Sequence, residues 1–202
     1  MDEIVLRGMA KWPDVPAVYG WLALDRRGNW LLKGERIANS GVIAFIGRNY
    51  GHDAQGRWFF QNGPQRVFVA LEYAPMVYRV VVPDNAPLAL ETHTGKAVMD
   101  VRESWVDEGG SVLLNTEHGA GTIHDGDLDQ LLSEFVDAGG NSLDEDALEA
   151  RLEQLERGHT PELYFKHRGR VVKVEPMRSL DAPRRFGYQP RPDPAPGEPE
   201  CR

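Results

Sequence analysis

The stretch DRRGNWLLKG, residues 25–34, decides the fold, because it returns as DAQGRWFFQNG at residues 53–63. Asp, Gly and Trp stand at the same offsets in both copies, with one extra residue before the closing Gly of the second. In the first copy a polar turn separates two short apolar runs, which is typical of a β-hairpin. Gly28 and Gly56 can take the positive φ that such a turn requires. We interpret the repeat as a turn, with an aromatic recognition surface as the alternative.

A larger repeat surrounds these turns. Two stretches have the same predicted order of strand, loop ending in Ile, helix, strand, turn and strand, and they close at Pro75 and Pro176. We infer an internal duplication. The predicted fold class is α+β, with two related units of antiparallel β-hairpins that each pack on a helix. The predicted domains are an N-terminal unit at residues 1–86, a C-terminal unit at residues 87–180 and a Pro-rich tail at residues 181–202.

Three helices have sequence signals. Asn39 or Ser40 can cap the helix GVIAFIGRNY. Asp125 can cap a second helix that ends at the glycines 139–140, and Ser142 with Glu145 forms a capping box for a third. The last two helices predict an αα-hairpin inserted into the second unit.

The C-terminal tail differs in composition from the body. Residues 181–202 contain six prolines and few apolar side chains. Such a segment buries too little apolar surface to offset the entropy of ordering. We therefore expect it to be disordered in isolation.

The charge is distributed unevenly along the chain. Residues 1–90 carry 10 Lys and Arg against 8 Asp and Glu, whereas residues 101–160 carry 3 basic and 15 acidic side chains. An acidic surface repels the phosphate backbone, so we expect no nucleic-acid partner. These acids are typical of helix starts and solvated faces, and a docking surface for a basic partner is the alternative.

The ends of the chain bear on its location. Asp2 and Glu3 stand where a secretory signal would be basic, and no apolar run approaches the roughly 20 residues needed to cross a bilayer. We expect a cytoplasmic protein without a membrane partner. The single cysteine, Cys201, cannot form an intramolecular disulfide framework.

A cluster of His and acidic residues raises the possibility of a metal. His118, His124 and Asp125 could supply ligands to zinc, and a metal-assisted hydrolase that uses them is the alternative function. The two histidines are six residues apart across a Gly-rich loop, a spacing that matches no standard zinc pair. Helix capping explains the acids better, so we expect neither a metal nor another cofactor.

One stretch is a candidate binding site. GRNYGHDAQGRW places five residues with directional polar or aromatic groups at a helix end and hairpin: Arg48, Asn49, Tyr50, His52 and Arg57. Arg and Tyr are favoured at recognition sites. We expect a ligand or partner site there, with ordinary packing of Tyr50 as the alternative.

A family resemblance runs from Trp30 to Pro75. The run W-L-L-x-G-x-x-I, a short helix with Phe45, G-x-W and a strand ending in A-P resemble an uncharacterised proteobacterial domain-of-unknown-function family whose structures contain repeated α+β motifs. The resemblance implies the fold type and a suggested signalling or regulatory role. It assigns no catalytic residues.

The sequence thus favours a noncatalytic cytoplasmic binding or regulatory protein. Its partner would be a small molecule or a protein, and its oligomeric state stays open. The metal-assisted hydrolase is the second hypothesis.

Overall fold

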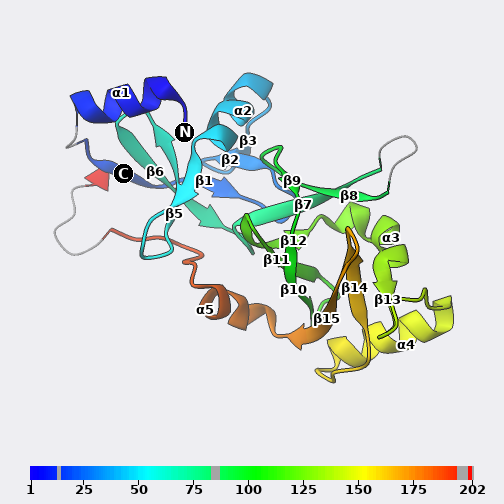
Figure 1. Ribbon diagram of the computed structural model, residues 1–202. Coiled ribbons are helices and arrows are strands. Elements are labelled where there is room, and N and C mark those ends of the chain that lie inside the picture. Colours follow the sequence, from blue (N-terminus) through cyan, green and yellow to red (C-terminus); the bar gives the residue numbers. More distant parts are fainter. Residues whose placement is uncertain (13–14, 83–86, 195–199, 202) are drawn as a thin grey trace. The chain divides into compact units, whose positions relative to one another are not determined.

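The computed structural model describes residues 1–12, 15–82, 87–194 and 200–201. They form two compact units (Figure 1): unit 1 comprises Met1–Pro75 and Phe186–Arg202, and unit 2 comprises Met76–Arg185. Each unit combines a largely antiparallel sheet with short helices. The predicted α+β class is therefore confirmed.

Unit 1 contains a sheet in the order β3-β2-β1-β6-β5-β4, and β16 also pairs with β1. The strands are β1 (Ala17–Leu24), β2 (Trp30–Leu32), β3 (Glu35–Arg36), β4 (Tyr50–His52), β5 (Trp58–Asn62), β6 (Gln65–Leu71) and β16 (Glu200–Cys201). The helices are α1 (Glu3–Lys11) and α2 (Ser40–Arg48). Asn39 caps α2 as predicted, because its side chain accepts a hydrogen bond from the Val42 N–H at 3.0 Å.

Unit 2 contains a sheet in the order β13-β14-β15-β10-β11-β12-β7-β8-β9. The strands are β7 (Met76–Val81), β8 (Ala89–Thr92), β9 (Ala97–Val98), β10 (Val101–Asp107), β11 (Val112–Thr116), β12 (Gly119–Ile123), β13 (Phe135–Val136), β14 (Tyr164–His167) and β15 (Arg170–Met177). The helical segments are η1 (Asp125–Asp127), α3 (Leu128–Leu131), η2 (Leu132–Glu134), α4 (Glu145–Glu156), η3 (Ser179–Asp181) and α5 (Ala182–Phe186), whose last residue belongs to unit 1.

The two sheets have the same topology. The order β3-β2-β1-β6-β5-β4 corresponds strand for strand to β12-β11-β10-β15-β14-β13. In chain order, each unit has a helical segment between the third and fourth of these strands: α2 lies between β3 and β4, and α3 lies between β12 and β13. The central pairs, β1 with β6 and β10 with β15, are parallel in both units, whereas the hairpin pairs are antiparallel. This agreement supports two copies of one folding module.

The repeated Asp and Gly build one type of turn. Each turn Asp donates its N–H to the carbonyl four residues later, and the N–H of the Gly three residues later donates to the Asp carbonyl. The Asp carboxylate also accepts from the N–H groups two and four residues later. The four turns begin at Asp25, Asp53, Asp107 and Asp137.

The glycine of each turn has a positive φ, as the sequence predicted for Gly28 and Gly56. Its φ is 79° at Gly28, 75° at Gly56, 77° at Gly110 and 78° at Gly140. A side chain would strain this conformation. The Asp–Gly repeat is therefore a structural turn in both units.

The tryptophans that follow the turns in unit 1 lie inside. Trp30 is 1% exposed and Trp58 is 7% exposed. Both indoles pack against the ring of Tyr50, with centroid distances of 5.0 and 4.8 Å. They belong to the core and do not form an exposed aromatic surface.

The helices inserted in unit 2 differ in detail from the prediction. The first is divided into η1, α3 and η2, and the apolar pair Phe135 and Val136 leaves it to form β13 against β14. The cap of α4 is Asp144, whose carboxylate accepts a hydrogen bond from the Ala147 N–H at 2.8 Å. Ser142 instead forms an isolated antiparallel β-bridge with Val136. Among the described residues, no helix has both the length and the apolarity to cross a membrane.

The chain passes from unit 1 to unit 2 just before β7, and the predicted domain boundaries stay a prediction. The predicted boundary at residues 86 and 87 adjoins residues 83–86, which lie outside the described part. The observed division falls between Pro75 and Met76, because β7 pairs in parallel with β12 of unit 2. Hydrogen bonds across this pair add β7 to the second sheet.

The tail is ordered at residues 181–194, where it packs against the body of the protein, and its disorder in isolation stays a prediction. Tyr188 is buried, and its hydroxyl donates to the Tyr73 carbonyl at 2.7 Å. The Pro190 carbonyl accepts from the Leu71 N–H at 2.7 Å. These contacts with unit 1 offset the entropic cost of ordering the segment.

Candidate functional site

The five predicted binding residues are used for contacts within unit 1. Arg48 pairs with Asp2 at 3.1 Å. Asn49 is buried, and its side chain accepts from the Asp2 N–H and donates to the Phe45 carbonyl. These two residues therefore connect the start of α1 to the end of α2.

The aromatic and basic members of the set are also engaged. The Tyr50 hydroxyl donates to the Pro75 carbonyl at 3.0 Å, and burial raises the pKa of Tyr50 well above its ordinary value. The His52 ring packs on Trp58 at 4.8 Å. These two side chains stabilise the aromatic cluster at β4.

Arg57 completes the turn at Asp53. Its Nε donates to the Asp53 carboxylate at 2.7 Å. Burial raises the pKa of Asp53, but hydrogen bonds and charge from Arg57 lower it to a net value below the ordinary one. The set that the sequence grouped as a binding site thus consists of residues with structural partners, and whether any of them also binds a ligand stays a prediction.

The alternative metal residues lie at different places in unit 2. His118 precedes β12 and His124 follows it, so a strand that rises about 3.3 Å per residue separates them. Asp125 is close to His124, with 3.4 Å between its Oδ1 and Nδ1 of the histidine. In the part of the chain that the structure describes, no group of three or more His, Cys, Asp or Glu side chains could hold a metal ion.

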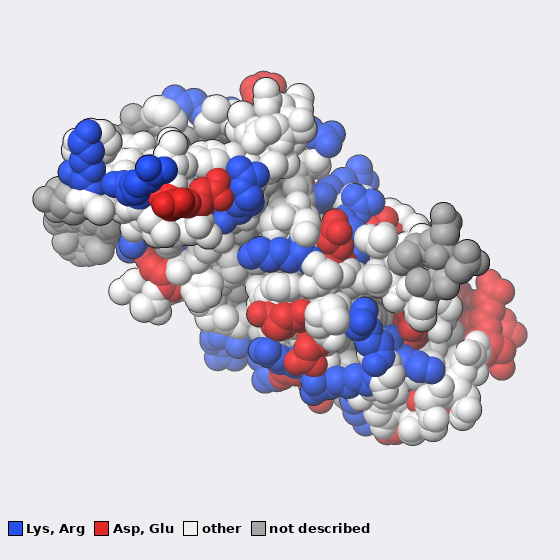
Figure 2. Space-filling model, turned by 45° about the horizontal axis from the view of Figure 1, so that its top comes forward, with Lys and Arg blue, Asp and Glu red and all other residues white. Residues whose placement is uncertain are grey.

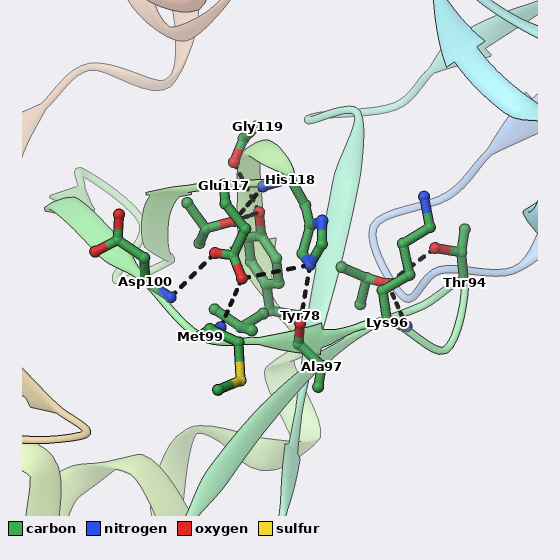
Figure 3. A network of polar contacts seen from close by, with 12 residues as sticks. Tyr78, Thr94, Lys96, Ala97, Met99, Asp100, Glu117, His118 and Gly119 are labelled. Carbon is green, nitrogen blue, oxygen red and sulfur yellow. Dashed lines mark hydrogen bonds and ion pairs between the residues drawn. The ribbon is translucent and has the colours of Figure 1, made fainter.

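His118 instead belongs to a polar network that fastens two turns together (Figure 3). Its Nε2 lies 2.9 Å from the Ala97 carbonyl and 3.5 Å from the Glu117 carboxylate. Glu117 accepts hydrogen bonds from the N–H groups of Met99 and Asp100, at 2.6 and 3.1 Å. These bonds outweigh the effect of burial and lower the pKa of Glu117. The network therefore ties the segment after β9 to the turn between β11 and β12.

A pocket of about 520 Å³ lies elsewhere in unit 2, beside Trp105 of β10. The C-terminal end of α4 contributes Leu155 to its lining, and the end of β15 contributes Pro176 and Met177. The segment that follows β15 contributes Arg178, Asp181, Arg184 and Arg185, and the lining is completed by Glu108, Glu156, Gly158 and Glu175. We call this site the Trp105 pocket.

The wall after β15 is fixed by Glu108, which follows β10. Its carboxylate accepts hydrogen bonds from the backbone N–H and the hydroxyl of Ser179 at the start of η3. The bond from the Ser179 side chain is the largest cause of the lowered pKa of Glu108. The turn at Asp107 thus positions the segment that closes the pocket.

The charges of the Trp105 pocket are mixed. The guanidinium of Arg185 lies 5.4 Å from the Trp105 ring and pairs with Glu103 at 3.3 Å. Arg184 is exposed and is in no ion pair among the residues that the structure describes. Three arginines and four carboxylates line the pocket: Arg178, Arg184, Arg185, Glu108, Glu156, Glu175 and Asp181. The lining therefore offers both signs of charge beside an apolar wall.

Lysine and arginine are also interspersed with acidic residues on the face of the protein that Figure 2 shows. Such a surface lacks the continuous basic stripe expected of a nucleic-acid interface on that face.

The residues of the Trp105 pocket were not singled out from the sequence. Residues 178–185 contain three arginines, which could have indicated an anion-binding site. They stand where the Pro-rich tail begins, and such tails are typically disordered, so the sequence did not favour a site there. Trp105 occupies the position of Ala23 in unit 1, since both stand two residues before the turn Asp. A comparison of the two copies would have identified it.

The topology and the pocket together define a duplicated α+β protein with a concave site in its second copy. The DUF2944 family model, with the description "Protein of unknown function (DUF2946)", matches residues 1–193, and the chain belongs to this family. The predicted relationship to a family of unknown function is thereby confirmed. The search of curated proteins found no match.

Two solved structures are similar. A DUF1285 family protein from Silicibacter pomeroyi DSS-3 is 13% identical, with a TM-score of 0.52 over 83% of this chain and 87% of that chain. A second DUF1285 family protein, from Shewanella baltica OS155, is 18% identical, with a TM-score of 0.41 over 58% of this chain and 91% of that chain. The first similarity concerns the fold alone.

Proposed function

We propose that the protein is a noncatalytic binding protein that holds a small molecule in the Trp105 pocket. The proposal rests on two structural differences between the copies. Unit 1 has Ala23 where unit 2 has Trp105, and it has no counterpart of α4 between β4 and β5. These two differences between the copies meet at the Trp105 pocket.

The size and lining favour a small ligand. A volume of about 520 Å³ falls in the range of roughly 300–1,000 Å³ that is usual for ligand pockets. The half-buried Pro176 and Met177 would contact an apolar part of the ligand, and the arginines would contact an anionic group such as a carboxylate. The acidic rim would discriminate against ligands that carry only negative charge.

The residue types favour binding over catalysis. No Ser, Cys, His or Lys is among the described residues that line the pocket, so a nucleophilic hydroxyl, thiol, imidazole or amine is lacking there. The regulatory or signalling role that the family resemblance implies would follow from ligand occupancy.

A thermal-shift screen of amino acids, nucleotides and carboxylic acids tests the proposal, followed by titration of each hit. We expect at least one compound to bind with one-to-one stoichiometry and Arg184→Ala to weaken it about tenfold or more. The matched control is Arg36→Ala, which removes an exposed arginine from β3 of unit 1 and should leave the affinity unchanged. Equal binding to the wild type and Arg184→Ala would refute the assignment to this pocket.

A further inference from the structure

A second groove lies in unit 1 between its sheet and the C-terminal segment. It has a volume of about 540 Å³. Tyr19 and Trp21 of β1 and Phe68 of β6 line one side, and residues 191–194 line the other. We call it the aromatic groove.

The aromatic side of the groove is rigid. The rings of Tyr19 and Phe68 stack at 4.5 Å with an interplanar angle of 12°. Arg57 donates to the Tyr19 hydroxyl at 3.2 Å, and its guanidinium lies 4.6 Å from the Phe68 ring centroid. At the other end of the groove, Lys33 Nζ lies 3.9 Å from the Trp21 ring centroid. The rings are therefore positioned before any ligand arrives.

The floor between the aromatic side chains is open. Gly20 has a φ of 73°, and, apart from its neighbours Tyr19 and Trp21, no heavy atom of the described residues lies within 4 Å of where its Cβ would stand. Ala70 of β6 supplies only a methyl group to the lining. An inserted ring can thus reach the backbone between Tyr19 and Trp21.

The chain itself shows which side chains this face accommodates. Pro192 is buried where the C-terminal segment lines the groove, and Pro194 also contributes to the lining. The hydrogen bond from the Leu71 N–H to the Pro190 carbonyl attaches the segment to β6. A segment with proline at alternate positions, 190, 192 and 194, is thereby placed along aromatic side chains.

We propose that the aromatic groove binds a proline-rich peptide of a partner protein, which lies beside the chain's own proline segment. A polyproline II helix loses little conformational entropy on binding, and its rings fit between aromatic side chains. The half-buried Trp21 is the main anchor, because it combines a large apolar face with a ring that is already oriented. The proposal concerns unit 1 and does not depend on the Trp105 pocket.

The test is a titration of the full chain with octaproline, followed by NMR chemical shifts of the indole N–H groups and by calorimetry. We expect saturable binding that shifts the Trp21 signal, and Trp21→Ala should weaken the affinity at least about tenfold. Trp12→Ala is the matched control, since Trp12 is 52% exposed and has Lys11 Nζ 4.4 Å from its ring centroid but lies outside the groove. It should bind octaproline as the wild type does.

A second variant covers the case in which Trp21→Ala fails to fold. Ala70→Leu keeps every aromatic ring and fills the floor of the groove, so it should also abolish binding. No saturable binding by the wild type, or equal affinity of octaproline for the wild type and Ala70→Leu, would overturn the proposal. Concentration-dependent dimers of the protein alone that Ala70→Leu dissociates would also overturn it, because the occupant would then be a second copy.

Discussion

The indole ring of Trp30 meets the ring of Tyr50 edge to face, with 5.0 Å between their centroids and an interplanar angle of 79°. Trp30 begins the strand after the turn at Asp25, and Tyr50 begins the strand before the turn at Asp53. The contact therefore joins the hairpin that turns at Asp25 to the hairpin that turns at Asp53. It also gives Tyr50, a predicted ligand residue, a role in the core.

Two substitutions separate the roles of the Tyr50 hydroxyl and ring. Tyr50→Phe removes only the hydrogen bond to the Pro75 carbonyl, which is left without this donor, and should lower the free energy of unfolding by about 1–2 kcal/mol. Tyr50→Ala also removes the contacts with Trp30 and Trp58 and should cost about 3–5 kcal/mol. Urea unfolding followed by tryptophan fluorescence measures both. Equal losses would contradict the role of the ring.

The turn carboxylates should differ in importance with their burial. Asp107 is buried and accepts from the N–H groups of Gly109 and Ser111, so Asp107→Ala should destabilise unit 2 by about 2–3 kcal/mol. Asp137 makes the equivalent bonds in an exposed turn, so Asp137→Ala should destabilise unit 2 less than Asp107→Ala does. Thermal unfolding by calorimetry compares the two variants. A larger loss for Asp137→Ala would refute this ranking.

The turn glycines differ in what surrounds them. A Cβ at Gly56 would approach the Gly187 carbonyl oxygen to 1.9 Å, whereas a Cβ at Gly140 would meet no heavy atom within 4 Å among the described residues beyond its two chain neighbours. Gly56→Ala should therefore displace the C-terminal segment and cost about 3 kcal/mol or more, and Gly140→Ala should cost only the roughly 1 kcal/mol of its strained φ. Limited proteolysis of the segment that follows Gly187 should be faster in Gly56→Ala than in the wild type, and Gly140→Ala should be cleaved at the wild-type rate. If both variants are cleaved at the wild-type rate, Gly56 does not hold the segment in place.

The pair of Asp53 and Arg57 should make stability depend on pH. Because the pKa of Asp53 is lower in the folded protein than in the unfolded chain, its ionised form stabilises the fold above the ordinary aspartate pKa of about 3.9, and this stabilisation is lost as the pH falls through the folded value. Asp53→Asn should cost about 2 kcal/mol at pH 7, and the difference from the wild type should shrink below about pH 4. Urea midpoints between pH 3 and pH 7 measure it. A difference that stays constant down to pH 3 would contradict the assignment.

Some features of the fold were predictable because their interactions are short in sequence. The turns at Asp25 and Asp53 depend on hydrogen bonds that span at most four residues, so the residue pattern contains all the groups involved. The turn at Asp137 was missed because its glycines also match the end of a helix. The strand pairing of Phe135 and Val136 that prevents this helix comes from β14, more than 25 residues away.

The candidate site could not be predicted in the same way. Arg48 and Tyr50 look like recognition residues in their own segment, but their partners Asp2 and Pro75 lie 46 and 25 residues away. The Trp105 pocket likewise combines β10, α4 and residues 178–185, which adjoin only in the folded chain. Residue type indicates which groups a side chain can contact, and the fold determines which of those groups lies next to it.

The sequence by itself determined the turns, the α+β class and the duplication, because repeated Asp–Gly turns and alternating apolar runs act within one hairpin at a time. The tertiary structure decided that β7 joins the second sheet, that the segment around Tyr188 packs on the first, and that Trp105 lies beside an open pocket. Each of these outcomes depends on hydrogen bonds or packing between segments far apart in the chain. A local pattern cannot encode those pairings, because several segments could form the same backbone hydrogen bonds. Only packing in the folded chain determines which segment pairs with which.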